Sequence, residues 1–289
     1  MLPRLTAILG EGPVLLGADG IYSASGLESS TEQSEELGYR DAVAARQSGD
    51  YLKAVAGSHS VPVMDHEVDR FLSKMPQGAL ILDIGGCWGW HWRRLAEIRP
   101  DVGVVIMDFA RSNLVHALRM LGSLVGVQVA LLHADATALP FLDADEVTEG
   151  FDGVWTVQVF QHIPDFPLAC RESCRVLRRG GVFASYSLHA TPLNRLIYAI
   201  AGKHYHSEGM LDGAFHLTRA SEAQQQAISD IFCATVADRY SECLYHPELR
   251  LSFSGRPGSL VGKVDARLGE APWLGRWIAR QRGFEVVKS

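Results

Sequence analysis

Apolar and polar residues follow two alternating patterns along most of the chain. Short apolar runs with β-branched residues, each ended by turn residues, predict strands buried on both faces. Stretches in which apolar residues recur every three or four positions predict the helices between them. The predicted strands are 79–84, 102–108, 127–133, 151–159 and 180–188, and the helices between them include 110–121 and 165–179. This alternation favours an α/β fold with a doubly wound, Rossmann-like parallel sheet, whose ligands bind at the carboxyl ends of the strands.

The flanking regions give weaker patterns. A turn at residues 17–20 between two short apolar runs predicts a small hairpin, and hydroxyl residues ahead of acids at 28–36 predict the start of a helix. Residues 63–75 have helical spacing. Near the C-terminus, residues 235–245 and 284–287 have strand character, and residues 273–280 predict an amphipathic helix.

Composition and charge narrow the class of protein. The chain has 289 residues, 47% of them apolar, and a net charge of −6, which argues against a nucleic-acid partner because such binding depends on phosphate neutralisation. The apolar N-terminal residues are too short and interrupted for a signal peptide, and no apolar run approaches the ~20 residues of a membrane span. The five cysteines form no Cys-x-x-Cys pair and favour buried thiols in a reducing compartment. We therefore expect a cytoplasmic protein without a membrane partner.

The stretch 79–95 is the most informative part of the chain. Glycines at 85, 86 and 89 break the first predicted strand, and a helical pattern then resumes. Such a turn permits positive φ, and the following helix N-terminus offers unpaired N–H groups to a polar cofactor tail. The dinucleotide fingerprint Gly-x-Gly-x-x-Gly does not fit, because it would need glycine in place of Cys87 and Trp90.

The segment Asp83-Ile-Gly85-Gly86-Cys87-Trp-Gly89 resembles motif I of the class I S-adenosylmethionine-dependent methyltransferases, Asp/Glu-x-Gly-x-Gly-x-Gly. Cys87 stands where the middle glycine is usual. The resemblance implies that Asp83 holds the ammonium of the cofactor and that Gly85, Gly86, Cys87 and Gly89 form its turn.

Three further segments agree with this resemblance, which covers about residues 79–189. Asp108 ends the second strand, where an acid can accept hydrogen bonds from two ribose hydroxyls; the alternative is a cap for helix 110–121. Residues 133–141 resemble the family's Gly-Asp-Ala-x-x-Leu-Pro-Phe segment, and residues 151–165 and 177–181 resemble two later segments. The cofactor residues implied by these segments are Asp108, Phe109, Asp135 and Ala136 (the last two toward adenine), and Gln158 beneath the cofactor.

The resemblance also implies the domain organisation. We expect one globular unit with a hairpin and helical extension at 1–60, a cofactor-binding core at 61–189, a lid insertion at 190–230, and C-terminal strands at 231–289 that complete the sheet in antiparallel fashion. The extension would contribute acceptor-pocket residues, with packing as the alternative for each. The pocket candidates are Tyr39, Tyr51, His59 and His66.

Two histidines follow predicted strands at the end where the methyl group should lie. His162 follows the fourth strand and His189 the fifth, so each is a candidate general base. The alternatives are a hydrogen bond that fixes a loop for His162 and packing for His189. His204, His206, Asp212 and His216 suggest a metal cluster, but histidines two positions apart point apart on a helix, so no metal is expected.

The sequence therefore predicts an enzyme that moves a methyl group from S-adenosylmethionine to a small-molecule acceptor, with a hydroxyl as the expected acceptor and histidine assistance. N- or C-methylation remains open. A non-catalytic S-adenosylmethionine-binding scaffold is the alternative that the missing middle glycine favours, and a nicotinamide oxidoreductase conflicts with the glycine spacing. The oligomeric state is left open.

Overall fold

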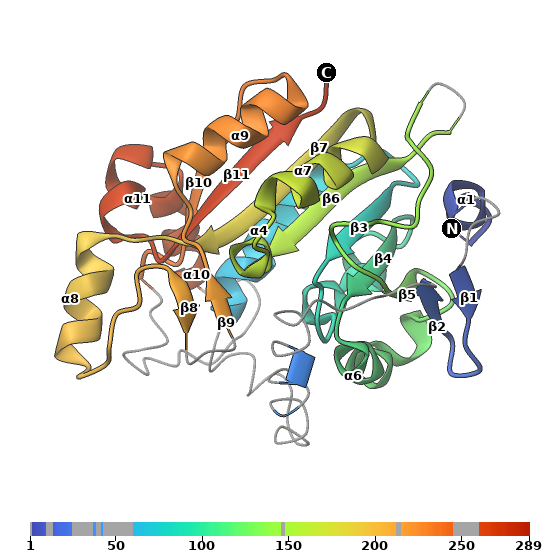
Figure 1. Cartoon of the computed structure of the whole chain (residues 1–289), viewed down its shortest axis with the longest axis horizontal. Coiled ribbons are helices and arrows are strands. Elements are labelled where there is room, and N and C mark those ends of the chain that lie inside the picture. Colours follow the sequence, from blue (N-terminus) through green and yellow to red (C-terminus); the bar gives the residue numbers. More distant parts are fainter. Residues whose placement is uncertain are drawn as a thin grey trace.

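A nine-stranded mixed sheet forms the centre of the molecule (Figure 1). The computed structural model describes residues 2–9, 14–24, 37–38, 42, 60–145, 148–211, 215–244 and 260–289. Within these residues the strand order is β1-β2-β5-β4-β3-β6-β7-β11-β10. A separate two-stranded sheet joins β8 (Gly209–Leu211) to β9 (Phe215–Leu217).

The five predicted core strands are present and parallel. They are β3 (Leu80–Ile84), β4 (Gly103–Asp108), β5 (Val129–His133), β6 (Phe151–Val157) and β7 (Leu177–Leu188). The chain order reverses direction at β3, which lies between β4 and β6. Ligands of doubly wound sheets bind at such a switch point, so the glycine turn after β3 occupies the expected place.

The two edges of the sheet are antiparallel. β11 (Gln281–Val287) pairs antiparallel with β7, and β10 (Ala237–Ser241) pairs antiparallel with β11, which confirms the predicted C-terminal strands. At the other edge, the predicted hairpin forms from β1 (Val14–Leu16) and β2 (Ile21–Ala24), and β2 adds to the sheet parallel to β5. The sequence did not predict that this hairpin joins the main sheet.

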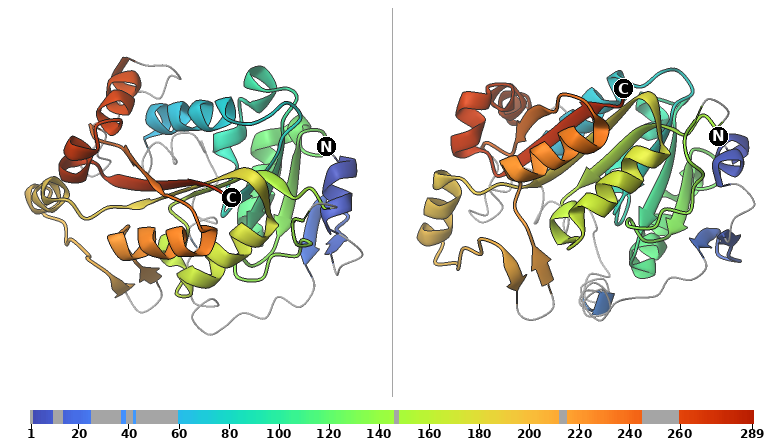
Figure 2. Two further views of the ribbon diagram at one scale, coloured as in Figure 1. Left: turned by 90° about the horizontal axis from the view of Figure 1, so that it is seen from above. Right: turned by 45° about the horizontal axis from the view of Figure 1, so that its top comes forward.

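Helices cover both faces of the sheet (Figure 2). One face packs against α1 (Leu2–Leu9), α7 (Phe166–Val176) and α9 (Glu222–Phe232), and the other against α4 (Val61–Ser73), α5 (Leu95–Ile98) and α6 (Arg111–Leu121). The remaining helices are α8 (Pro192–Ile200), α10 (Leu260–Gly269) and α11 (Pro272–Ile278), with short 3₁₀ turns η1 (Trp90–Trp92), η2 (Gly122–Leu124) and η3 (Phe160–His162).

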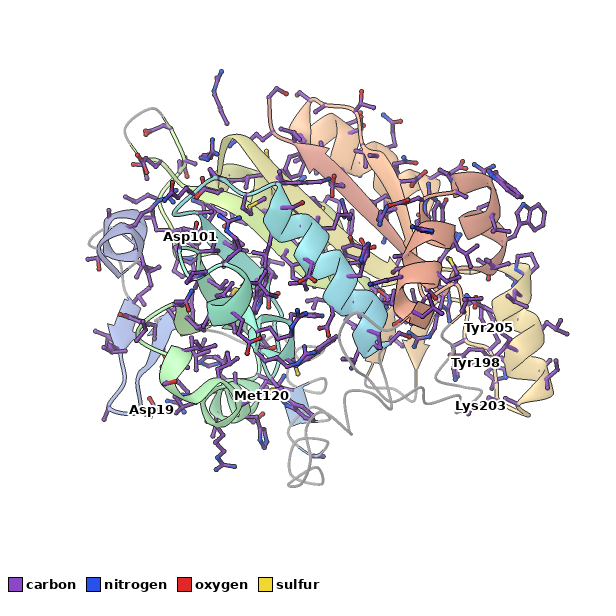
Figure 3. All side chains as sticks on the ribbon, turned by 180° about the vertical axis from the view of Figure 1, so that it is seen from behind. Asp19, Asp101, Met120, Tyr198, Lys203 and Tyr205 are labelled. Atoms are coloured by element: carbon purple, nitrogen blue, oxygen red, sulfur yellow. The ribbon has the colours of Figure 1, made fainter. Side chains whose placement is uncertain are left out.

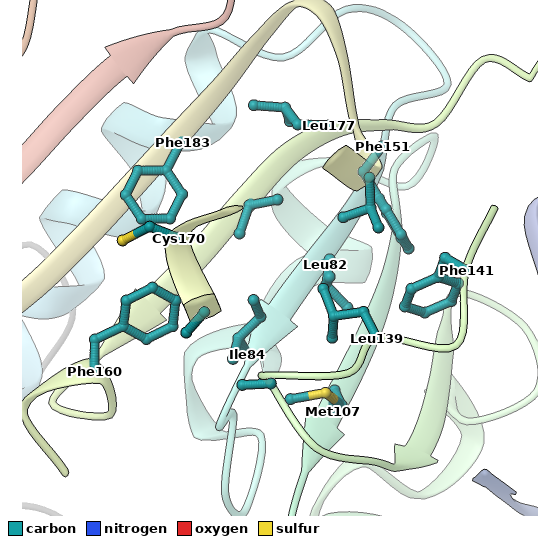
Figure 4. Packing of buried hydrophobic residues seen from close by; sticks show 14 of the residues in the cluster. Leu82, Ile84, Met107, Leu139, Phe141, Phe151, Phe160, Cys170, Leu177 and Phe183 are labelled. Atoms are coloured by element: carbon teal, nitrogen blue, oxygen red, sulfur yellow. The ribbon is translucent and has the colours of Figure 1, made fainter. Parts of the chain in front are cut away.

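The alternation of side chains along the strands divides the core in two. Leu80, Leu82 and Ile84 join the cluster under α7 and α9, part of which Figure 4 shows around Phe160 and Phe183. Ile81 joins the cluster under α4 and α6. Asp83 is two positions after Ile81 in β3, so its side chain points to the same face of the sheet. Its carboxylate therefore lies on the α6 side, beside Trp92.

Two expectations about helices were wrong. The predicted helix 165–179 ends at Val176, and residues 177–179 already belong to β7. Arg178, which the predicted helix included, lies in β7 and pairs with Asp152 at 2.6 Å. The glycine turn is not followed by a helix N-terminus either, since a three-residue 3₁₀ turn, Trp90–Trp92, comes first and α5 has only four residues.

A buried ion cluster fixes α4 against the sheet. Glu67 of α4 is fully buried and accepts hydrogen bonds from Arg239 of β10, Tyr186 of β7 and Arg70. Burial raises the pKa of Glu67, but the hydrogen bond and charge of Arg239 hold the pKa below its ordinary value. A buried carboxylate with several cationic partners sets one orientation of α4, whose N-terminal end lies near the carboxyl end of β7 through Ser60 and Glu242.

The region expected to form a lid has two parts. α8 and the β8–β9 hairpin follow β7, whereas α9 packs on α7 and contributes Ile228 and Phe232 to the core. Most of the expected helical extension, including Tyr39, Tyr51 and His59, lies outside the described residues, as does Asp212. None of the described helices has the length and apolar character needed to cross a membrane.

Candidate active site

The turn after β3 closes against the end of β4. The N–H groups of Gly85 and Gly86 both donate to the carbonyl of Met107, at 2.7 and 3.1 Å, and the N–H of Gly89 donates to the carbonyl of Gly86 at 2.8 Å. The first backbone N–H groups after β3 are therefore paired with carbonyl groups of the protein itself. The cofactor elements of β3 and β4 therefore form one connected backbone unit.

The glycines of this turn are required by the packing of the protein itself. Gly85 and Gly89 have positive φ angles of 69° and 70°. A Cβ at Gly85 would collide with Val159, one at Gly86 with the carboxylate of Asp83, and one at Gly89 would lie 2.7 Å from Leu121. Glycine is the residue that permits this close approach without strain.

Cys87 has a backbone conformation that glycine adopts without strain. Its φ angle is +51°, in the left-handed region that non-glycine residues rarely adopt. The turn thus forms with cysteine at the position where the family motif has glycine. The strain of such a residue, of order 1 kcal/mol, persists because the flanking hydrogen bonds fix the backbone.

Asp83 is buried beside the turn and carries a perturbed carboxyl group. Its Oδ2 accepts a hydrogen bond from the indole N–H of Trp92 at 2.7 Å. Burial raises the pKa of Asp83 to about 7; the hydrogen bond from Trp92 opposes the rise, and the negative charge of Asp108 adds to it. A carboxylate held in this way gains from a cationic ligand, which fits the ammonium of S-adenosylmethionine.

Asp108 is held by three donors. Its Oδ1 accepts from the backbone N–H of Ala110 at 2.8 Å and from Nδ2 of Asn113 at 3.2 Å, and its Oδ2 accepts from the backbone N–H of Cys87 at 3.0 Å. These donors contact both carboxylate oxygens and so fix the orientation of the carboxylate. Asp108 therefore anchors the start of α6, as the alternative expected, and contacts the glycine turn; its binding of ribose stays a prediction.

The adenine side of the expected site lies at the ends of β4 and β5. Asp108 and His133 are neighbours in the parallel register, and Nε2 of His133 is 3.0 Å from the carbonyl oxygen of Phe109. Asp135 accepts from the N–H and hydroxyl of Thr137, both at 2.8 Å, in a local turn that carries Ala136. Phe109 is half-buried and Ala136 buried, so the structure brings these sequence-predicted residues to one sheet edge.

Gln158 follows β6 with a positive φ angle of 57°. Its backbone N–H donates to the carbonyl of Tyr186 at 2.7 Å, but its side-chain Nε2 is buried without a hydrogen-bond partner. An unsatisfied buried amide is unfavourable by about 1–3 kcal/mol, so a ligand oxygen at this position would stabilise the site.

The ring of His162 is fixed on both sides. Nδ1 lies 2.6 Å from the carbonyl oxygen of His216 in β9, which sets Nδ1 as the donor, and Nε2 is 2.9 Å from Nε2 of Gln161, from which it accepts. Gln161 in turn accepts from the N–H of Leu188 at 2.7 Å. His162 thereby ties η3 to the β8–β9 hairpin, which agrees with the loop-fixing alternative.

His189 lies at the end of β7 among residues of the C-terminal strands. Its backbone N–H donates to the carbonyl of Arg280 at 2.8 Å, and its ring packs 5.8 Å from that of Tyr240. Burial lowers the pKa of His189 to about 4, and the charge of Arg282 adds to the effect. A neutral imidazole with so low a pKa is a weak base.

A further polar set, which the sequence did not single out, lies where α4 meets β10 and β11. Gln281 and Ser241 are paired in register and fully buried. Among the described residues, neither the two amide atoms of Gln281 nor the hydroxyl of Ser241 has a hydrogen-bond partner. The buried hydroxyl of Ser60, at the start of α4, also lacks one. Gln281 pairs with Leu188, so this set lies at the carboxyl end of β7, on the cofactor edge of the sheet.

No group of three or more potential metal ligands forms among the described residues. His204 and His206 pack ring against ring at 4.6 Å.

The comparisons with known proteins agree with this geometry. Residues 82–185 match the family model described as a methyltransferase domain. The chain therefore contains a class I S-adenosylmethionine-dependent methyltransferase domain. S-adenosylmethionine is the cofactor of this family, and the buried Asp83, the anchored Asp108 and the unpartnered amide of Gln158 fit it.

Two curated methyltransferases are similar in sequence. A malonyl-[acyl-carrier protein] O-methyltransferase of Gallionella capsiferriformans is 26% identical over 255 residues, covering 81% of each chain. A demethylmenaquinone methyltransferase of Thermus thermophilus is 38% identical over 114 residues, which are 39% of this chain and 48% of that protein. The second similarity thus covers a minority of this chain and about half of that protein.

A methyltransferase of Haloferax volcanii, solved with its activator Trm112, has the same fold. The TM-score is 0.57 at 17% identity, covering 88% of this chain and 97% of that one. The methyltransferase fold thus extends over most of the chain, beyond the residues that the family model matches.

Proposed function

We propose that this enzyme methylates an oxygen atom of a small-molecule acceptor, and that this oxygen is already ionised near neutral pH, as in a carboxylate or an acidic phenol or enol. The observation that carries the proposal is that neither candidate base, His162 or His189, is suited to remove a proton from the acceptor. His162 has both ring nitrogens engaged in hydrogen bonds, and the pKa of His189 is about 4. A neutral alcohol would need a stronger base.

S-adenosylmethionine supplies an electrophilic methyl group on a sulfonium. The residues of this chain then have three tasks: to bind the methionine and ribose parts of the cofactor through Asp83 and Asp108, to align the acceptor, and to exclude water. Alignment alone gives large accelerations in such displacements, so an anionic oxygen requires no proton transfer from the protein.

The unpartnered buried groups of Gln281, Ser241 and Ser60 are our candidates for acceptor contact. They lie at the carboxyl end of β7 and offer amide and hydroxyl groups in a site where an unpaired polar atom is unfavourable. An acceptor carrying a carboxylate or carbonyl would satisfy the donor atoms of this set.

The relatives support oxygen as the acceptor but include another class. The relative aligned over most of both chains is by name an O-methyltransferase. The other is by name a demethylmenaquinone methyltransferase. A sterol 24-C-methyltransferase of Eremothecium gossypii is also similar, at 34% identity over 38% of this chain, so C-methylation is the second candidate. A non-catalytic scaffold loses its support from sequence, because the turn forms with Cys87 in a backbone conformation that glycine adopts.

The test is an acceptor panel with the full chain and S-adenosylmethionine. The panel contains size-matched carboxylates, phenols, neutral alcohols and amines, and the readouts are S-adenosylhomocysteine release and mass spectrometry of the product. We expect O-methyl products from the acidic acceptors and, for the carboxylates at saturating S-adenosylmethionine, a rate nearly independent of pH between about 6 and 9. Methylation of amines alone or of neutral alcohols would contradict the proposal, and tight cofactor binding without turnover on any acceptor would favour the scaffold.

A variant pair tests the acceptor contact. Gln281→Leu should raise the KM for the acceptor about ten-fold and leave S-adenosylhomocysteine affinity unchanged. Gln224→Leu is the matched control, because Gln224 is also buried with both amide atoms unpartnered but belongs to α9. Equal effects of the two substitutions on KM would remove Gln281 from the acceptor site.

A further inference from the structure

Two neighbouring helices at one end of the molecule expose large apolar side chains. α8 and α11 pack against each other, and Nδ2 of Asn194 in α8 donates to the carbonyl of Ala279 just after α11. Figures 1 and 2 show the two helices at the same end of the sheet. Their exposed residues are Leu196 and Ile200, at 56% and 71% relative exposure, and Trp273 and Trp277, at 71% and 58%.

The exposed faces are set by the packing of the opposite faces. α11 rests on Tyr240 through Gly275, where a Cβ would collide with the tyrosine ring, so Trp273 and Trp277 lie away from that contact. α8 buries Asn194 and Ile197, which leaves Leu196 and Ile200 outside. Each exposed pair has i,i+4 spacing and so forms one stripe. A surface helix that is apolar on both faces indicates a partner for the outer face.

The charged residues within these two helices are positive, and the exposed acids Glu208 and Glu270 lie just outside the segments 190–207 and 271–284. Arg195 and Arg276 are exposed on the two helices, and Lys203 is exposed just after α8. Residues 190–207 and 271–284 contain no acidic residue, although the whole chain has a net charge of −6. We define Leu196, Ile200, Trp273, Trp277, Arg195 and Arg276 as the α8–α11 surface.

We propose that the α8–α11 surface binds the interface of an anionic phospholipid bilayer. Tryptophan favours the boundary between lipid and water, and aliphatic side chains at i,i+4 spacing enter the acyl region while arginine and lysine contact anionic headgroups. A second copy of the chain fits less well, because a two-fold contact would bring the same cationic surfaces together without acidic partners. The enzyme would lie on the bilayer and not span it, and the proposal does not depend on which acceptor atom is methylated.

The test is sedimentation of the full chain with vesicles of phosphatidylcholine alone and of phosphatidylcholine with about 30% phosphatidylglycerol. We expect at least about ten-fold tighter binding to the anionic vesicles, a blue shift of tryptophan emission on binding, and weaker binding at about 0.5 M salt. Equal or absent binding to both kinds of vesicle would overturn the proposal without any variant.

Variants locate the binding surface. Trp273→Ser combined with Trp277→Ser should weaken vesicle binding about ten-fold or more, and Arg276→Glu should weaken binding to anionic vesicles alone. Leu15→Ser combined with Leu16→Ser is the control, because these residues of β1 are 74% and 58% exposed. The β1–β2 hairpin, marked by Asp19 in Figure 3, lies at the opposite end from Tyr198 and Lys203.

Each variant is first compared with the wild type by thermal melting and S-adenosylhomocysteine affinity, which should not change. Undiminished vesicle binding by the tryptophan variant would overturn the proposal. So would a wild-type dimer in light scattering that the same variant converts to a monomer, because a second copy would then cover the surface.

Discussion

The backbone N–H of Cys87 donates a hydrogen bond to Oδ2 of Asp108 at 3.0 Å. This contact joins the turn after β3 to the end of β4, the two places from which the site would hold the methionine and ribose parts of the cofactor. Asp83 and Asp108 lie on the same face of the sheet, and their charges interact. The acidic residues of the site therefore respond to each other as well as to a ligand.

Replacing Asp108 should weaken cofactor binding strongly. Asp108→Ala removes an acceptor for the ribose hydroxyls and frees the N–H groups of Cys87 and Ala110, so we expect the Kd for S-adenosylhomocysteine to rise about 100-fold, measured by calorimetry. Asn113→Ala removes one donor to the carboxylate and keeps the carboxylate itself. We expect less than about five-fold from that control; an Asp108→Ala protein that binds as tightly as the wild type would exclude Asp108 from the site.

Cys87 gives a test of the turn conformation. Cys87→Gly should keep cofactor affinity and increase the free energy of unfolding by about 0.5–1 kcal/mol, because glycine adopts positive φ without strain. Cys87→Val should lower both, since a β-branched residue is strongly disfavoured in the left-handed region. Denaturant unfolding and calorimetry measure the two effects. A thiol needed for binding would instead make Cys87→Gly weaken the affinity while Cys87→Ser preserves it.

The fold and the cofactor side of the site were largely predictable from local sequence. Buried parallel strands have a continuous apolar pattern. Asp83 and Asp108 lie in the last two residues of such strands and Gln158 directly follows one, which places all three at one sheet edge. The conformation of Cys87 was not predictable, because it depends on hydrogen bonds of its neighbours to Met107 and of its own N–H to Asp108.

The features that the sequence predicted wrongly or not at all depend on contacts between residues far apart in the chain. The end of α7 at Val176 is set by the pairing of Leu177 with Phe151, which competes with the helical pattern of residues 177–179. The polar set at Gln281 and Ser241 forms only when β10, β11 and β7 are assembled. His162 contacts Gln161 and the carbonyl of His216, which is 54 residues away in the chain. The sequence alone therefore could not decide whether His162 is a general base or fixes a loop.

A conservative variant of His162 distinguishes a structural role from that of a general base. His162→Ala should destabilise the protein by about 1–3 kcal/mol and lower kcat/KM, because it leaves the carbonyl of His216 and the amide of Gln161 without a partner. In His162→Asn the side-chain amide can still donate to the His216 carbonyl. We expect this variant to recover most of the stability and activity. Recovered stability with activity as low as in His162→Ala would identify His162 as the base.

Asp83 should make stability and cofactor binding depend on pH. Its pKa is about 7 in the folded chain, against an ordinary value of 3.8. Below both values the carboxyl group is protonated in the folded and unfolded states, so it has no effect. As pH rises toward 7, ionisation favours the unfolded state, and the folded state loses up to about 4 kcal/mol, since one pKa unit corresponds to 1.36 kcal/mol.

Asp83→Asn removes this ionisation and retains an oxygen that can accept from Trp92. We therefore expect the variant to unfold like the wild type near pH 4 and to be more stable than the wild type near pH 8, measured by denaturant unfolding without cofactor. Its affinity for S-adenosylmethionine should be lower, and the increase of wild-type affinity between about pH 6 and 8 should be absent. Methylthioadenosine, which lacks the ammonium group, is the control ligand and should bind both proteins equally. If the variant keeps the pH dependence of the wild type, another group than Asp83 titrates in the site.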